Sequence, residues 1–245
     1  MTLVFIHAFP FDHRMWLPVV TDVESAGLEV VTIDLPGFGG TALPEGPPDL
    51  AAVAAEVIPA LPQDCVLAGV SLGGYVVMEI LRTKGAPVPS GIALCDTKAS
   101  ADTPAAQSNR LAMADLARAY PEEIGQTLIT SLLPGLLGRE PAPGVTRQVE
   151  TWLREAPASA VAWYQCAMAA RPDSHGDLAN FDGPSLVLWG DQDALSPSVE
   201  QESMLGVLSD PTNVCIPEAG HLACVEDPGL TAQALIEWIR LRGIG

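Results

Sequence analysis

A serine between closely spaced glycines is the first residue whose setting indicates chemistry. It lies in Gly69-Val70-Ser71-Leu72-Gly73-Gly74, between an apolar run typical of a strand and a stretch typical of a helix. There the G-x-S-x-G pattern predicts a nucleophile elbow, a tight turn that holds Ser71 in a strained backbone conformation. The helix N-terminus, with its Leu72 N–H, favours an oxyanion. The pentapeptide also fits an ordinary strand-to-helix turn, so other residues must show whether Ser71 is a nucleophile.

Two later segments supply carboxylates and a histidine. Trp189-Gly190-Asp191-Gln192-Asp193 follows one strand-like run, and Gly220-His221 follows the next, which gives the order Ser, Asp, His. The histidine can take a proton from the serine, and a carboxylate can orient the imidazole and stabilise its cation. Asp191 and Asp193 compete for that role, and Asp96 is a third candidate because it also ends a strand-like run.

Taken together, these motifs resemble the α/β-hydrolase superfamily, specifically its small esterase, enol-lactonase and cofactor-free haloperoxidase-like members. The resemblance covers nearly the whole chain through five motifs in order, namely His7-Ala8-Phe9-Pro10, Asp34-Leu35-Pro36-Gly37-Phe38-Gly39-Gly40-Thr41, the serine segment, Gly190-Asp191-Gln192-Asp193 and Gly220-His221. It implies a three-layer α/β-hydrolase fold with a helical cap, inserted after the position of the family's sixth strand.

The resemblance also implies roles for particular residues. It makes Ser71, His221 and Asp193 the catalytic triad, which leaves Asp96 a structural role. The oxyanion hole is expected from the backbone N–H groups of Phe9 and Leu72. The chain departs from the family pattern at Ala8, because relatives have a His-Gly pair where this chain has His7-Ala8. This difference concerns the backbone angle of the loop and not its expected role.

The elements that must position these residues alternate between strands and helices. Strands are predicted at Leu3–His7, Glu29–Asp34, Cys65–Val70, Gly91–Cys95, Ser185–Trp189 and Asn213–Pro217. They are apolar on both faces, as parallel strands covered by helices require. Helices are predicted at Leu50–Ile58 and Leu72–Lys84, and after Ser196-Pro197 and Asp227-Pro228. Only one strand precedes His7, so we expect about six parallel strands, with the usual N-terminal hairpin reduced or absent and Glu29–Asp34 at an edge or covered by a partner chain.

One interval contains helices only and divides the chain. Residues 1–98 and 181–245 are assigned to the hydrolase core and residues 99–180 to the cap. Helices within the cap are predicted at Leu111–Tyr120, Glu122–Leu133, Val145–Glu155 and Ser159–Ala170. The cap has six basic and nine acidic residues, a net charge of -3, and is the least acidic part of the molecule.

Side chains of the cap are candidates for contact with a substrate. Its large apolar residues predict an apolar pocket, and we single out Met113, Leu132, Trp152 and Trp163 as substrate-binding. The others are Leu128, Leu133, Leu136, Tyr164 and Met168. Six arginines could hold an anionic substrate, although solvated helix faces explain most of them; they are Arg110, Arg118, Arg139, Arg147, Arg154 and Arg171.

Composition excludes several classes of partner and cofactor. The 245 residues are 48% hydrophobic and 17% charged, with a formal net charge of -18, so nucleic acids and anionic membranes would be repelled. No apolar run approaches the roughly 18 residues of a membrane span, and no basic leader precedes the first strand, so we expect a cytoplasmic protein. The five cysteines lack C-x-x-C spacing, and no histidine pair has metal-ligand spacing. We therefore expect neither a metal nor a cofactor.

The predicted activity is hydrolysis of small to medium, largely apolar carboxylic esters through an acyl-enzyme. Alternatives with the same triad are an enol-lactonase that acts on a carboxylate-bearing lactone and a perhydrolase that uses peroxide. Haloalkane dehalogenase and epoxide hydrolase activities are disfavoured, because similar enzymes have aspartate at the position of Ser71. A non-catalytic ligand receptor on the same fold is the alternative from another class. Oligomeric state is left open.

Overall fold

A single parallel sheet forms the centre of the molecule. The computed structural model describes residues 1–244, in which six strands pair in the order β2-β1-β3-β4-β5-β6, all parallel. The strands are β1 (Thr2–Ile6), β2 (Glu29–Ile33), β3 (Cys65–Val70), β4 (Gly91–Cys95), β5 (Pro184–Gly190) and β6 (Asp210–Ile216). The predicted six parallel strands are confirmed, and β2 lies at an edge as expected.

Burial follows the position of each strand in the sheet. All residues of β3 and β4 are buried, whereas both edge strands, β2 and β6, contain exposed residues. The expectation that every strand is apolar on both faces is therefore wrong for the edges, where helices cover less of the surface. In the register, Ile6 of β1 pairs with Gly69 of β3, and Val70 pairs with Cys95 of β4. The carboxyl ends of neighbouring strands consequently meet at one edge.

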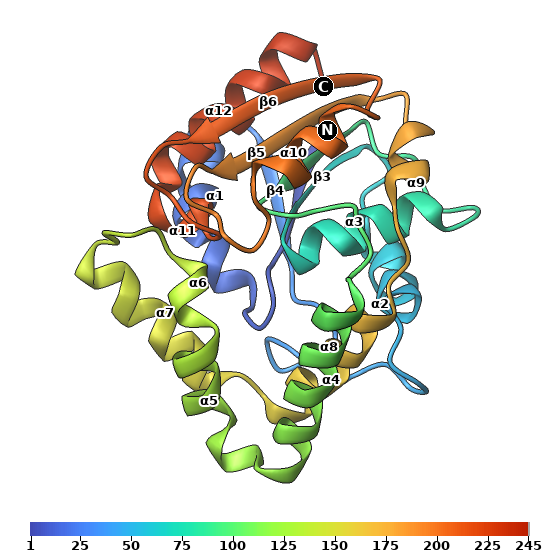
Figure 1. Cartoon of the computed structure of the whole chain (residues 1–245). Coiled ribbons are helices and arrows are strands. Elements are labelled where there is room, and N and C mark those ends of the chain that lie inside the picture. Colours follow the sequence, from blue (N-terminus) through green and yellow to red (C-terminus); the bar gives the residue numbers. More distant parts are fainter. Residues whose placement is uncertain (245) are drawn as a thin grey trace.

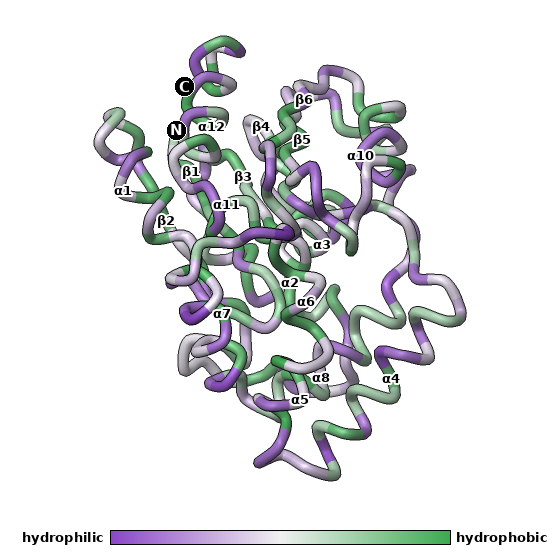
Figure 2. The backbone as a smooth tube through the Cα atoms, turned by 60° about the vertical axis from the view of Figure 1, so that its left-hand side comes forward, coloured by the Kyte–Doolittle hydropathy of each residue, from purple (hydrophilic) through white to green (hydrophobic). Residues whose placement is uncertain are grey.

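Helices cover both faces of the sheet. They are α1 (Leu17–Ser25), α2 (Leu50–Val57), α3 (Leu72–Arg82), α4 (Pro104–Ala119), α5 (Ile124–Ser131), α6 (Leu133–Leu136), α7 (Pro143–Glu155), α8 (Ala158–Ala170), α9 (His175–Ala179), α10 (Ser198–Leu205), α11 (Ala223–Glu226) and α12 (Pro228–Arg242). Helix α1 packs against α12, and α2 packs against α3. Figure 2 shows α1 and α12 on one side of the strands and α3 and α10 on the other. The predicted three-layer α/β fold is confirmed.

Helices α4 to α9 separate β4 from β5 in the sequence, and we refer to residues 99–180 as the helical insertion. Helix α4 packs against α8 and α5 against α7, and these two pairs lie below the carboxyl edge of the sheet in Figure 1. Helix α4 begins at Pro104, seven residues before the predicted Leu111, because the Thr103 side chain accepts a hydrogen bond from the Ala106 N–H and caps the helix. No helix within residues 1–244 is both long and apolar enough to cross a membrane.

Glycines allow α3 to lie directly against the strands beside Ser71. A Cβ atom on Gly69 would collide with the backbone of Gly73, and a Cβ atom on Gly73 would collide with the Ile6 carbonyl oxygen. In both cases the obstacle is backbone, which no side-chain movement can relieve. The spacing of these glycines is therefore a packing requirement of the turn.

An alanine at this contact tests the packing requirement. We expect Gly73→Ala to lower the free energy of unfolding by about 2 kcal/mol or more, because the added methyl group must separate α3 from β1. Gly144→Ala is the matched control, since Gly144 lies in α7 with no atom within 4 Å of its added Cβ. It should raise stability by about 0.5–1 kcal/mol, since alanine favours helix. Urea unfolding of both variants measures the difference, and equal effects would contradict the close contact.

Candidate active site

Ser71 occupies a strained turn between β3 and α3. Its backbone has φ 51° and ψ -109°, a conformation that L-residues rarely adopt. Three hydrogen bonds hold this turn: the Ser71 N–H donates to the Cys95 carbonyl at 3.0 Å, while the Ser71 carbonyl accepts from Thr97 Oγ1 at 2.8 Å and from the Tyr75 N–H at 3.2 Å. The end of β4 therefore helps to fix the serine that follows β3.

A chain of hydrogen bonds links Ser71 to a histidine and a carboxylate. His221 Nε2 lies 2.8 Å from Ser71 Oγ, and His221 Nδ1 lies 2.8 Å from Asp193 Oδ2. Asp193 and His221 are buried and lie on the loops that follow β5 and β6. Three residues far apart in the sequence thus meet at the carboxyl edge of the sheet.

Asp193 is held by further donors. Its Oδ1 accepts the N–H groups of Leu195 and Ser196, at 2.8 and 3.0 Å, and its Oδ2 accepts the Ser196 hydroxyl at 2.5 Å. The sequence predicts Ser196 only at the start of a helix and does not indicate its contact with Asp193. An aspartate three residues before a serine, ahead of a helix, is a pattern that favours such local hydrogen bonds.

The two competing carboxylates have other partners. Asp191 Oδ1 accepts the Glu218 N–H at 2.8 Å. Asp96 is fully buried, and its two oxygens accept the N–H groups of Gly190 and Ala223, at 2.9 and 3.0 Å. Burial raises the pKa of Asp96 to about 7, with a further contribution from the charge of Asp193. Within residues 1–244, neither Asp191 nor Asp96 forms a hydrogen bond with His221.

Electrostatic effects on His221 and Asp193 favour an ion pair. Burial disfavours the imidazolium, but the charge and hydrogen bond of Asp193 outweigh it and raise the pKa of His221 above 6.5. Burial likewise works against the carboxylate, and His221 together with the Ser196 donors lowers the pKa of Asp193 below its usual range. The carboxylate therefore stabilises positive charge on the imidazole.

His7 supports the loop that leads to Phe9. Its Nε2 accepts the Leu35 N–H at 2.9 Å, so the proton lies on Nδ1, which donates to the Ala8 carbonyl at 3.0 Å. Burial lowers the pKa of His7 to about 4, which keeps the ring neutral. The backbone at Ala8 does not have a positive φ. Alanine therefore fits where the family pattern has glycine.

A cavity of about 320 Å³ opens at Ser71 and His221 between the core and the helical insertion. Its lining is formed by Phe9, Ser71, Tyr75, Lys98, Asp102, Ala106, Asn109, Arg110, Leu132, Leu136, Gln165, Met168, Ala194, Leu195 and His221. Phe9 thus lies where the oxyanion loop was expected, and Leu132 lies where a substrate contact was expected. Leu72, whose N–H was the other one expected in the oxyanion hole, is the first residue of α3 and directly follows Ser71.

Three of the four predicted substrate contacts lie elsewhere. Trp163 precedes Gln165 by two residues on α8 and therefore points away from the cavity; its ring packs on Tyr164. Trp152 packs on Phe11 beside a separate hollow. Met113 lies beyond the part of α4 that lines the cavity and packs against the core. Aromatic character alone did not identify the lining, because helical phase decides which side chains face inward.

The cavity is also more polar than expected. Helices α4 and α8 present Asn109, Arg110 and Gln165 to it, and Lys98 and Asp102 complete this wall. The expectation of an apolar pocket is therefore wrong for the wall formed by α4 and α8. The leucines of the α5–α6 segment keep the other wall apolar.

Two side chains tie the helical insertion to the site. Glu226 accepts the N–H of Gly220, next to His221, and the N–H of Gly138, each at 2.7 Å. Gln192, next to Asp193, accepts the Arg139 N–H at 2.7 Å. We call these contacts the insertion clamp. The sequence does not indicate this clamp, because its acceptors bind backbone N–H groups whose positions only the fold determines.

Three potential metal ligands also meet outside this site. Atoms of Asp12, His13 and Asp34 lie within 4.8 Å of one another. Both carboxylates already have partners, because Arg14 binds Asp12, and His13 donates to Asp34 through its N–H at 2.7 Å. This group therefore joins the loop after β1 to the end of β2.

Loss of one clamp acceptor should weaken the fold locally. We expect Glu226→Gln to lower the free energy of unfolding by about 1–3 kcal/mol, because the amide has one acceptor oxygen and turns donors toward a backbone N–H. Glu202→Gln, at an exposed position of α10, is the control and should change stability by less than about 0.5 kcal/mol. Hydrogen exchange at Gly138 and Gly220 should accelerate in Glu226→Gln only, and unchanged exchange there would exclude the clamp.

Comparison with known proteins places this geometry in a family. Residues 3–234 match the Alpha/beta hydrolase family. The structure of a thermophilic esterase from Thermogutta terrifontis, with malate bound, is similar with a TM-score of 0.91 and 32% identity, over 98% of this chain and 90% of that chain.

Two curated relatives extend the comparison. A pimeloyl-(acyl-carrier protein) methyl ester esterase of Aeromonas hydrophila is 27% identical over 232 residues, which cover 92% of this chain and 90% of that protein. The bifunctional biotin biosynthesis protein BioHC of Saccharophagus degradans is 28% identical over 248 residues, which cover 95% of this chain. The match spans 43% of that longer protein. With most of its length matched by the family, the chain belongs to the Alpha/beta hydrolase family.

Proposed function

We propose that this protein hydrolyses carboxylic esters through a covalent acyl-enzyme. The observation that carries the proposal is the continuous hydrogen-bonded chain from Ser71 through His221 to Asp193, which opens onto a cavity. An esterase and methyl ester esterases among the similar proteins support the same reaction class.

In the first half of the reaction, Ser71 acts as nucleophile. His221 Nε2 accepts the hydroxyl proton while Oγ attacks the ester carbonyl, and Asp193 stabilises the imidazolium that results. The backbone N–H groups of Phe9 and Leu72 then stabilise the oxyanion. Since Leu72 is the first residue of α3, its N–H has no partner within the helix.

In the second half, water releases the acyl group. The first half leaves the acyl group on Ser71, because the imidazolium of His221 protonates the leaving alcohol as the ester C–O bond breaks. The neutral imidazole then takes a proton from water as that water attacks the acyl-enzyme. Collapse of the second tetrahedral intermediate returns the proton to Ser71. The reaction balances with water alone and needs no cofactor.

The helical insertion defines the substrate volume. We propose that residues 99–180 act as a cap over a core formed by residues 1–98 and 181–245. A cavity of about 320 Å³ suits a small to medium ester. Leu132 and Leu136 would contact the apolar part of such a substrate. A lactone that bears a carboxylate is a second candidate, favoured by the cationic side chains Lys98 and Arg110 in the cavity wall.

Removal of the nucleophile tests the chemistry directly. We expect Ser71→Ala to lose ester hydrolysis by about 10⁴-fold or more and to remain folded, because the reaction then lacks its covalent step. A phosphonate that reacts with activated serines should add one equivalent to the wild type only, as measured by intact-protein mass spectrometry. Equal labelling of the alanine variant would contradict the assignment.

The two aspartates after β5 provide a matched pair. Asp193→Asn should lower kcat by about 10³–10⁴-fold, because the imidazole loses its orienting partner, whereas Asp191→Asn should stay within about tenfold of the wild type. The opposite ranking would transfer the role to Asp191.

The pH profile distinguishes loss of the partner from general damage. His221 must be neutral to accept a proton, and Asp193 raises its pKa, so activity of the wild type should fall as pH drops through a midpoint above 6.5. In Asp193→Asn the imidazolium of His221 loses its carboxylate partner but stays buried, so its pKa falls. The midpoint of the activity profile should therefore move to lower pH. A profile of kcat/KM against pH for both proteins measures this shift.

A further inference from the structure

One buried carboxylate at the start of the helical insertion faces three cationic side chains. Asp102 has 1% of its side chain exposed; Arg110 Nε lies 2.5 Å from its Oδ2 and Arg171 Nη1 lies 2.9 Å from its Oδ1. Lys98 Nζ lies 3.7 Å from the same Oδ1. Burial alone would raise the pKa of Asp102, but Arg110 and Arg171 hold it below its usual range. This group, the Asp102 cluster, thus carries three positive charges and one negative charge.

Arg171 is the structural member of the Asp102 cluster. Its side chain is 4% exposed, and it donates to the carbonyls of Met168 and Ser100 at 3.0 and 2.8 Å. Its guanidinium carbon also lies 4.1 Å from the centre of the Tyr75 ring. These contacts fix Arg171 behind the cavity, where it can balance the charge of Asp102 without the other two cations.

Lys98 and Arg110 instead line the cavity that contains Ser71 and His221. The 3.7 Å separation leaves Lys98 Nζ beyond hydrogen-bonding distance of Asp102. The charge of Lys98 also opposes protonation of His221, so the ammonium group acts on the reacting histidine. Arg110 uses Nε for Asp102 and Nη1 for Gln165 Oε1 at 3.2 Å and Met168 Sδ at 3.4 Å, while its Nη2 forms no hydrogen bond within residues 1–244. Both cations therefore keep donors for a ligand.

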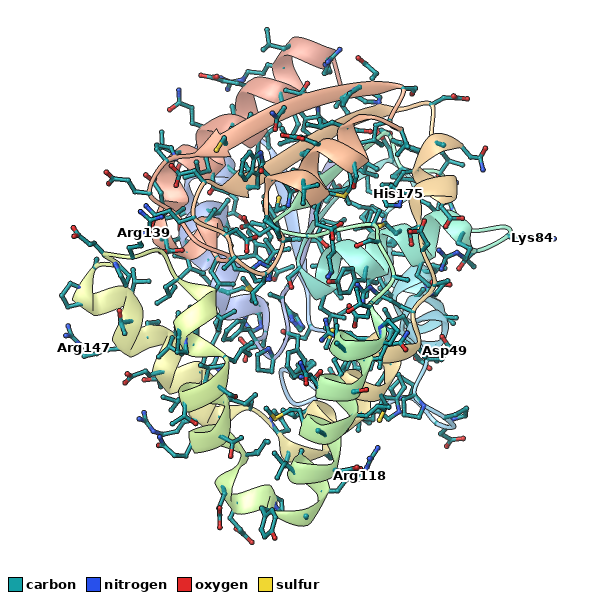
Figure 3. All side chains as sticks on the ribbon, in the orientation of Figure 1. Asp49, Lys84, Arg118, Arg139, Arg147 and His175 are labelled. Atoms are coloured by element: carbon teal, nitrogen blue, oxygen red, sulfur yellow. The ribbon has the colours of Figure 1, made fainter. Side chains whose placement is uncertain are left out.

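This positive charge is local to the cavity. The protein has a net charge of -18, and the arginines labelled in Figure 3 on the insertion, Arg118, Arg139 and Arg147, lie toward the outside of the molecule. The Asp102 cluster has three cations and one carboxylate, so its net charge is +2. This local positive charge beside the cavity attracts an anion despite the overall charge. A guanidinium also fits the planar, two-oxygen geometry of a carboxylate.

We infer that Lys98 and Arg110 form an anion subsite, and that the preferred substrates are esters that carry a carboxylate in the part bound in this cavity. The inference rests on the proposed ester hydrolysis and narrows its substrate class. Monoesters of dicarboxylic acids have this chemistry: the ester lies at Ser71 and the free carboxylate lies between Lys98 and Arg110. The negative charge of the substrate carboxylate would then offset part of the net positive charge of the Asp102 cluster.

Two substrates that differ only in charge test the subsite. Monomethyl adipate and methyl adipamate have the same carbon skeleton and end in a carboxylate and a neutral carboxamide. We expect the wild type to prefer the carboxylate ester by about tenfold or more in kcat/KM at low salt, with a smaller ratio at high salt. Methanol release gives both rates.

Three variants assign the preference to residues. Lys98→Gln and Arg110→Gln should each lower the ratio of the two kcat/KM values by about fivefold or more. Arg147→Gln, which removes an exposed arginine of the same insertion, should leave the ratio unchanged. If Arg110→Gln fails to fold because Asp102 loses a partner, Lys98→Gln still decides, since Asp102 then keeps both arginines.

The possible failures are distinguishable. If methyl adipamate is hydrolysed as fast as monomethyl adipate or faster, the proposed ester hydrolysis is supported and the anion subsite is overturned. If neither ester is hydrolysed, calorimetric binding of adipate to Ser71→Ala decides, because it needs no reaction. Weaker binding after Lys98→Gln would support the subsite, whereas equal binding or none would overturn it.

Discussion

The rest of the site depends on the strained backbone at Ser71. A residue with φ 51° costs about 1–3 kcal/mol and persists only where surrounding contacts leave no alternative. Here the contacts come from three directions: the glycines that admit α3, the Cys95 carbonyl at the end of β4, and the Thr97 hydroxyl. The nucleophile is thus held by the register of the sheet itself, and the loops with Asp193 and His221 are arranged around a fixed point.

Carboxylates that take no part in chemistry arrange those loops. Asp96 joins the end of β5 to α11, which follows His221, and Glu226 joins Gly220 to the helical insertion. Buried backbone N–H groups need acceptors, and a carboxylate can satisfy two at once. This explains why an acidic residue at the end of a strand is weak evidence for catalysis. The partner that each oxygen meets separates Asp193 from Asp96.

Much of the fold and of the candidate site follows from local sequence. The strand segments, the turn at Ser71 and several helix starts depend on patterns of neighbouring residues. The edge position of β2 and the meeting of Ser71, Asp193 and His221, which lie far apart in the sequence, follow from the order of the motifs through the family resemblance. The cavity wall formed by α4 and α8 cannot be predicted in this way. The phase of α8 turns Gln165 inward and Trp163 outward, and Asp102 meets Arg171 only after the insertion has folded back. Such contacts join residues far apart in sequence, so no pattern in the chain announces them.

The insertion clamp limits how the substrate-binding part of this protein can diverge. The backbones at Gly138 and Gly220 are in close contact. A Cβ atom on Gly138 would collide with the Glu218 carbonyl oxygen, and a Cβ atom on Gly220 would collide with the backbone of Leu137 and Gly138. Mutations in α4 or α8 can reshape the cavity and leave this contact intact, whereas insertions or deletions around residue 138 would displace Gly220 and, with it, His221. A new substrate specificity can therefore arise through changes in the helices, provided that the segment between α6 and α7 keeps its path past Gly220.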